Sequence, residues 1–231
     1  FHGGPPRLDR TAKTTQLLFD MENTNINYHP DWLGLRNIQT VVLADDGYVE
    51  GTANAGNVGG ANIIEATAIY DTEVPPAQRL LIVDSSITSE MSAAISILYQ
   101  SPLKKNIGPL AGWETTGQAA IDMHLEIPLV SKAVRAKGNV PTGNYQLSAE
   151  LADGSMAIPN TSIAVKQLAG SVTFSLQDGL KSQNMTGLFW DEPLTAKLYK
   201  TDGEQKLAFK TEFKPQSLTS LVDFPWPEVL S

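Results

Sequence analysis

The clearest alternation of hydrophobic and polar residues lies between Gly117 and Leu129. Hydrophobic residues occupy every odd position from 121 to 129, whereas positions 122, 124 and 126 carry Asp, His and Glu. Successive side chains of a β-strand point to opposite faces, so this alternation predicts a strand with one apolar and one hydrated face. Pro128 cannot donate a ladder hydrogen bond, which predicts that the strand ends there or lies at an edge.

Shorter segments on both sides alternate in the same way or are rich in β-branched residues, and they predict further strands. They cover residues 15–22, 26–28, 38–44, 48–52, 61–70, 80–83, 134–140, 145–151, 163–165, 172–176, 185–190, 194–199 and 207–213. Consecutive strands that are joined by short turns, without crossover helices, pair with their chain neighbours. The sequence therefore predicts an all-β, mostly antiparallel meander. A long curled sheet that forms an open groove is one arrangement of such a meander, and a closed sandwich or barrel is the other.

Asp-Gly pairs predict several of the turns, because glycine accepts the positive φ that tight hairpins need. These pairs are Asp46-Gly47, Asp153-Gly154, Asp178-Gly179 and Asp202-Gly203. The segment 53–60 is rich in Gly, Ala and Asn, and its composition predicts a flexible or tightly turned loop.

One segment, Ser89 to Tyr99, has helical rather than strand periodicity. Its residues Met91, Ala94, Ile95 and Leu98 fall on one face of a helix. Either Thr88 or Ser89 is expected to cap the helix, and Pro102 is expected to end it. A single amphipathic helix in an all-β pattern is expected to plug or cover an open end of the sheet.

Length and composition limit the classes of protein to consider. The chain has 231 residues, of which 42% are hydrophobic, and a net charge of −8. This acidity argues against nucleic-acid binding. The absence of cysteine excludes disulfides and thiolate metal sites. We expect residues 1–213 to form a single elongated segment and residues 214–231 to be an extended tail that begins a following unit of a longer protein.

The sequence offers little catalytic chemistry. His2, His29 and His124 lack the spacing of metal ligands, and no nucleophile elbow or phosphate-binding loop is present. On its strand, His124 is flanked by Asp122 and Glu126, which predicts a row of solvated charges rather than a site. We therefore expect no enzyme activity, no metal and no cofactor.

The apolar strand faces are the remaining signal, and two interpretations fit them. They are either the core of a closed sandwich or barrel, or the lining of a trough that suits acyl chains, which need burial but no directional partner. Alternation alone does not distinguish the concave face from the convex one. On the clearest strands, the residues predicted to line such a groove are Ile121, Met123, Leu125, Ile127, Leu129, Leu147, Val172, Phe174, Leu207 and Phe209.

Five features in a fixed order carry a family resemblance: residues 28–35 (YHPDWLGL), the run 80–83 (LLIV), Ser101-Pro102-Leu103, the strand from Gly117 to Leu129, and Gly138. In this order they resemble the central β-rich region of the AsmA-like proteins of Gram-negative bacteria, specifically the YhdP type, over residues 1–213. Where that family often has Trp-Pro, this chain has Trp32-Leu33, a small departure at a turn.

The resemblance implies a segment of a periplasmic protein that an N-terminal helix, absent from this chain, anchors in the inner membrane. Such proteins form an elongated groove that carries phospholipid between the inner and outer membranes. The expected partners are phospholipid acyl chains, the inner membrane, and outer-membrane or periplasmic proteins. The alternative is a β-sandwich binding or adhesion module of a cell-envelope or secreted protein.

Overall fold

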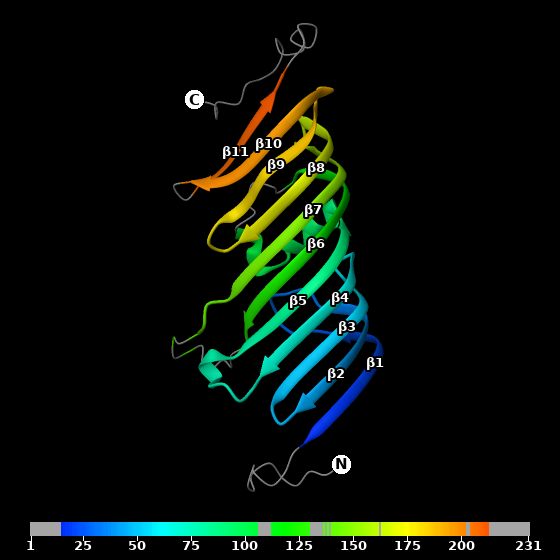
Figure 1. The fold of residues 1–231 in the computed structure, drawn as a ribbon, viewed down its shortest axis with the longest axis vertical. Helices are drawn as coiled ribbons and strands as arrows, with labels where there is room; N and C mark the ends of the chain where they lie inside the picture. The colour runs from blue at the N-terminus through cyan, green and yellow to red at the C-terminus, as the bar shows by residue number, and fades with distance from the viewer. Residues whose placement is uncertain are drawn as a thin grey trace.

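A computed structural model describes residues 15–105, 112–129, 136, 138, 140–161, 163–201 and 204–212. Their strands form one 11-stranded sheet in the order β1 to β11, and each strand pairs antiparallel with its chain neighbours. Figure 1 shows the strands stacked obliquely along the long axis. The predicted all-β antiparallel fold is confirmed, and among the described residues there is no second sheet of the kind that a sandwich needs.

Within the described part of the chain, one helix and two 3-10 turns accompany the strands. The elements are β1 Gln16–Ile26, β2 Leu35–Asp45, β3 Tyr48–Val58, β4 Ala61–Asp71, η1 Pro76–Gln78, β5 Leu80–Glu90, α1 Met91–Tyr99, η2 Pro102–Lys105, β6 Glu114–Pro128, β7 Asn144–Ala157, β8 Ala164–Ser175, β9 Gly179–Phe189, β10 Glu192–Thr201 and β11 Glu204–Thr211.

Two local predictions are confirmed. Strand β6 ends at Pro128, as expected of a residue without an amide hydrogen, and the next N–H, that of Leu129, donates to the Arg79 carbonyl at 3.3 Å. Asp46 and Gly47 form the two-residue turn of the β2–β3 hairpin, with φ values of 43° and 101°. Positive φ at both positions defines a type I′ turn, whose twist matches that of the flanking strands.

Two predicted turns are wrong. Residues 53–58 continue β3 and pair with β4, and the chain reverses only at Gly59 and Gly60. The small residues of this segment do not alternate between hydrophobic and polar, but their backbone groups pair with those of β4. Asp153 and Gly154 lie in a bulge within β7, because the pairing with β8 shifts between Leu151 and Gly154 and then resumes.

The helix also begins later than predicted. Ser89 and Glu90 remain in β5, so α1 starts at Met91, and Glu90 holds the N-cap position without a capping side-chain hydrogen bond. The Ser89 hydroxyl instead donates to the Glu90 carbonyl at 2.9 Å. The candidate strand 134–140 lies in part, and the Asp202-Gly203 turn and the tail 214–231 wholly, outside the described residues.

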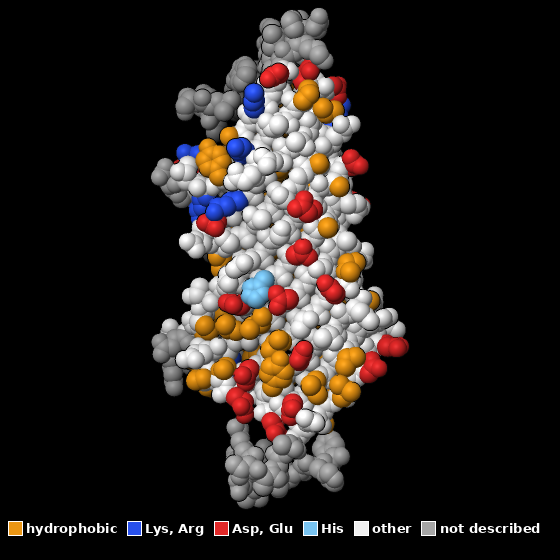
Figure 2. All heavy atoms as spheres, in the orientation of Figure 1, with side chains coloured by type: hydrophobic (Ala, Val, Ile, Leu, Met, Phe, Trp, Pro, Cys, Tyr) orange, Lys and Arg blue, Asp and Glu red, His pale blue; other side chains and the backbone are white. Residues whose placement is uncertain are grey.

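The sheet has two chemically distinct faces. We call the face that carries α1 the inner face; Figure 1 shows α1 and the dark blue β1–β2 connection behind the strands. The opposite, outer face is the one seen in Figure 2, where acidic side chains are scattered over the surface and hydrophobic side chains gather toward the end formed by the N-terminal strands. The alternation of β6 therefore separates an apolar inner set from a polar outer set, as predicted.

Candidate functional site: the apolar trough of the inner face

Strand register brings the predicted groove residues onto the inner face. Met123 pairs with Leu147, which pairs with Phe174 on the next strand. Ile121 and Val172 both pair with Ala149, and Leu207 pairs with Leu198. Paired residues point to the same side of a sheet, so these side chains form rows that run across the strands.

The remaining predicted residues follow the same pattern. Leu125 and Ile127 alternate in phase with Ile121 on β6, and Phe209 in phase with Leu207 on β11. Leu129 lies just beyond the end of β6 and is half-buried. Nine of the ten predicted residues therefore share the inner face within strands, which places them on one surface without showing what they bind.

Part of the inner face is filled by the chain itself; we call the inner face of β2–β4, together with Leu125 and Ile127 of β6, the filled section. Ile38 and Ile127 there are each 1% exposed, and Ile63 and Leu125 are buried. Helix α1, η2 and the β1–β2 connection provide the cover. A Cβ atom on Gly59, for example, would lie 2.7 Å from Ile97 Cγ1 of α1 and 2.9 Å from Leu33 Cδ1 of the connection.

The β1–β2 connection crosses the trough to reach the middle of the sheet. The Trp32 ring lies 5.6 Å from that of Tyr145, a β7 residue that pairs with Leu125 on the inner face. Desolvation by burial raises the pKa of Tyr28, on the same connection, to about 12, and burial also raises the pKa of Tyr145. The connection therefore lies over the inner face far enough to bury the hydroxyl of Tyr28 and to bring Trp32 against a β7 residue.

Beside α1 the described residues leave part of the inner face unfilled. A cavity of about 220 Å³ lies between α1 and the strands on its C-terminal side, and every residue that lines it is hydrophobic except Thr173. Apolar cavities of roughly 150 Å³ in other proteins stay dry and bind small hydrocarbons. Six of the predicted groove residues line this cavity: Ile121, Met123, Leu147, Val172, Phe174 and Leu207.

Sequence reasoning missed much of the lining. The additional residues come from α1, from Trp113 and from further inner positions on β5–β10. Leu168 is in phase with Val172 on β8, so strand alternation could have predicted it as a lining residue. The residues of α1 could not be predicted as lining, because nothing in the helix sequence indicates that the helix lies over the trough. The residues missed are Ile87, Met91, Ala94, Ile95, Ile97, Leu98, Trp113, Ala119, Ala149, Leu151, Met156, Leu168, Thr173, Leu180, Met185 and Leu198.

Beyond the cavity, the described residues leave the inner face of the last strand uncovered. We call the inner face of β11 the open section, because Leu194 and Ala196 on the neighbouring strand β10 are still buried. On β11, Leu207 is 51% and Phe209 55% exposed. At the other end of the sheet, the inner-face residue Phe19 on β1 is 47% exposed. The trough therefore presents hydrophobic side chains to solvent at both ends, and its lining suits a ligand that needs burial but no directional partner.

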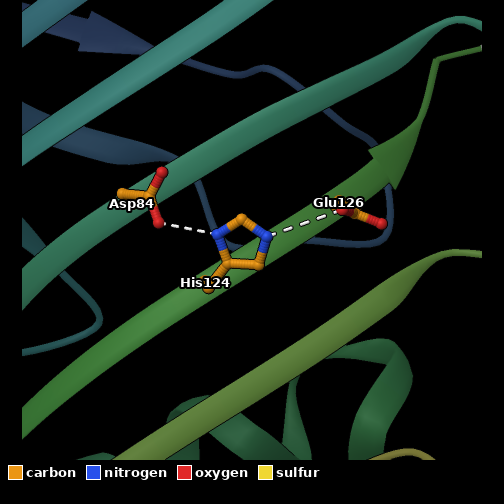
Figure 3. A network of polar contacts seen from close by, with 3 residues as sticks. All are labelled: Asp84, His124 and Glu126. Carbon is orange, nitrogen blue, oxygen red and sulfur yellow. Dashed lines mark hydrogen bonds and ion pairs between the residues drawn. The ribbon is translucent and has the colours of Figure 1, made fainter.

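The outer face carries the predicted charge row and one partner that the prediction missed. His124 Nδ1 lies 2.7 Å from Asp84 Oδ1 on β5, and Nε2 lies 3.6 Å from Glu126 Oε1 (Figure 3). The hydrogen bond with Asp84 is the main cause that raises the pKa of His124. A hollow of about 870 Å³ over β5–β9 is lined largely by such polar groups, including Gln146 and Lys181. The described residues hold no cluster of three His, Asp or Glu suited to a metal ion.

One curled antiparallel sheet whose inner face carries rows of apolar side chains defines an open β-groove protein. The chain belongs to the YhdP protein family, whose sequence profile matches residues 4–231. It is similar to the intermembrane phospholipid transporter YhdP of Escherichia coli (strain K12), with 26% identity over 207 residues, and the match covers 87% of this chain.

The match covers only 15% of that relative's length, so the chain corresponds to a short section of it. No solved structure matches the chain. Among the described residues, no helix has both the length and the hydrophobicity needed to span a bilayer.

Proposed function

We propose that this chain is a segment of a lipid-transfer protein and that its inner face carries the acyl chains of phospholipids between the inner and outer membranes. The observation that carries the proposal is the open section, where Leu207 and Phe209 are more than half exposed and continue the lining of the apolar cavity beside α1. The family membership supports it, since the relative in Escherichia coli is an intermembrane phospholipid transporter.

The energetics of the trough fit this substrate class. Each methylene that leaves water for an apolar surface contributes about 0.8 kcal/mol and requires no hydrogen-bond partner. A charged headgroup in the same place would lose its hydration without a partner, because the cavity lining offers no charged side chain. The acyl chains therefore lie along the inner face, and the headgroup stays at the water-filled opening of the trough.

This function requires binding rather than chemistry. The residues that line the cavity include no acid, no base, no serine and no cysteine, and Thr173 pairs with Ser148 and Lys181 on the outer face. In the cell, the segment lies in the periplasm as part of a protein that is anchored in the inner membrane through a region outside the described residues. Membrane-associated or periplasmic proteins that receive the lipid are its further partners.

Lipid extraction tests the proposal. The chain is purified from a Gram-negative host without detergent, extracted with organic solvent and analysed by mass spectrometry. A second sample is stripped of lipid and incubated with vesicles of phosphatidylethanolamine and phosphatidylglycerol before analysis. We expect phospholipid in both samples in a fixed ratio to protein. Absence of phospholipid from both samples would contradict the proposal.

A further inference from the structure

Helix α1 interrupts the trough. On its N-terminal side lies the filled section, with Ile63 of β4 buried, and on its other side lies the apolar cavity. Ile63 pairs with Ile87, and Ile87 lines the cavity whereas Ile63 does not. If acyl chains move along the inner face, as the proposed function requires, they meet α1 between β4 and the open section.

Helix α1 is short and has one uncapped end. It has nine residues, of which only Met91 is fully buried, and no side chain caps its N-terminus. Ala94 packs against the buried core, whereas Ile95 and Leu98 line the cavity without belonging to that core. Isolated helices of this length are marginal in water, and elements with few buried contacts open at low cost.

With α1 resting on the inner face, one buried hydroxyl group, that of Ser85, has no hydrogen-bond partner. The Ser85 hydroxyl is buried and makes no hydrogen bond, although its lateral neighbours on the inner face are the apolar residues Ala66 and Met123. Leaving a buried hydroxyl unsatisfied costs about 1–3 kcal/mol, a cost that an opened trough with access to water or to a lipid ester removes. The packing of the inner face with α1 in place therefore carries an energetic cost at Ser85.

We propose that α1 is a gate on the trough: it rests on the inner face in the closed state and lifts to let an acyl chain pass between the cavity and the filled section. This inference rests on the proposed function and adds a regulatory step to it. Lifting α1 away from β5 and β6 uncovers Ile87, whose lateral neighbour Ile63 belongs to the filled section.

A reversible lock tests the gate. The chain has no cysteine, so a designed pair reacts alone. A Cβ on Gly60, in the β3–β4 turn, would lie 3.6 Å from Ala93 Cβ on α1, within the range of about 3.5–4.5 Å found in disulfides. Gly60 has a φ of 96°, so Gly60→Cys is strained in both redox states, and comparing oxidised with reduced protein cancels that strain.

The readout is photo-crosslinking with a diazirine-bearing aliphatic amino acid at Ile63 or at Leu207. The lipid probe is a vesicle of phosphatidylethanolamine and phosphatidylglycerol. We expect Leu207 to be labelled in both redox states, and labelling at Ile63 to fall at least about fivefold on oxidation. Equal labelling of Ile63 in both states, or none in either state while Leu207 is labelled, would overturn the gate. No labelling of Leu207 in reduced protein would instead overturn the proposed function.

Hydrogen exchange on the unmodified chain gives a second test that does not depend on the folding of the cysteine variant. Lipid binding is expected to reduce the protection of α1 amides while that of β5 and β6 stays constant. Protection of α1 that is unchanged or raised by lipid would contradict the gate.

Discussion

The filled and open sections of the inner face have the same alternating sequence pattern but differ in the solvent exposure of their hydrophobic side chains. Ile127 on β6 and Leu207 on β11 both belong to alternating strands of one sheet, yet the first is 1% and the second 51% exposed. The difference lies in the connections: the β1–β2 connection and α1 fold onto the inner face, whereas β9 and β10 are joined by only Trp190 and Asp191. An apolar strand face is thus core or binding surface according to what the neighbouring connections cover.

The largest expected effect concerns the filled section. Ile127→Ala removes buried methyl groups from a packed site, and we expect it to lower the free energy of unfolding by about 2–5 kcal/mol. Leu207→Ala, in the open section, is the matched control and is expected to cost less than about 1 kcal/mol because its side chain is half in water. Urea unfolding measures both. Equal losses would show that the two sections do not differ.

A second irregularity, at Gly117, where the β6–β7 register shifts between Thr116 and Gln118, gives the next largest effect. Gly117 has a φ of 103°, and a Cβ there would lie 2.5 Å from the Cα of Gly154 on the adjacent strand. Gly117→Ala is therefore expected to destabilise the fold by about 1–3 kcal/mol. Gly51→Ala is the control, because its Cβ would meet only ordinary contacts, 3.5 Å from Val42 Cγ2. Thermal unfolding compares the two variants, and a similar loss in both would refute the role of this irregularity.

A smaller effect is expected on lipid capture in the open section. Leu207→Asp places a charge where acyl methylenes are proposed to lie, and losing about two methylene contacts weakens capture about tenfold. Ala208→Asp adds the same charge on the outer face of the same strand, one residue away, and is expected to leave capture unchanged. Phospholipid bound per protein after incubation with vesicles is the measurement. An equal loss in both variants would indicate a nonspecific charge effect.

The smallest expected effect belongs to the outer face. The pKa of His124 is raised in the folded state, chiefly by the hydrogen bond with Asp84. Its contribution to stability is therefore fully present below the unfolded pKa of about 6.5 and is lost as pH rises through the folded pKa. Because His124 and Asp84 are both partly exposed, this contribution is expected to be at most about 1 kcal/mol. His124→Gln should remove the pH dependence, as measured by urea unfolding between pH 5 and pH 8; a pH dependence equal to that of the parent chain would assign it to other groups.

Much of the sheet could be predicted from sequence because its pairing is between chain neighbours. The alternation from Ile121 to Leu129 and the Asp46-Gly47 turn are local signals, and the structure realises both. The segment 53–58 could not be recognised as a strand, since its small residues have no alternating pattern and adopt strand structure by pairing with β4. Similarly, Asp153-Gly154 reads as a turn until the register with β8 shows it to be a bulge.

The trough was harder to predict than the strands. Periodicity could assign Met123 and Leu147 to one face, but not determine whether that face is covered. The cover comes from contacts between distant segments, such as Trp32 with Tyr145 and Leu33 with Ile97 across Gly59, for which neither partner carries a local signal. A sequence therefore predicts an apolar face more readily than it predicts whether the face is open.

Photo-crosslinking along β11 tests the central proposal most directly, because four consecutive positions there are all exposed and differ only in the face they occupy. A diazirine-bearing residue is placed in turn at Lys206, Leu207, Ala208 and Phe209, and each variant is irradiated with phospholipid vesicles. We expect lipid to label positions 207 and 209 and not 206 or 208. Labelling at all four positions alike, or at none, would contradict an inner face that carries acyl chains.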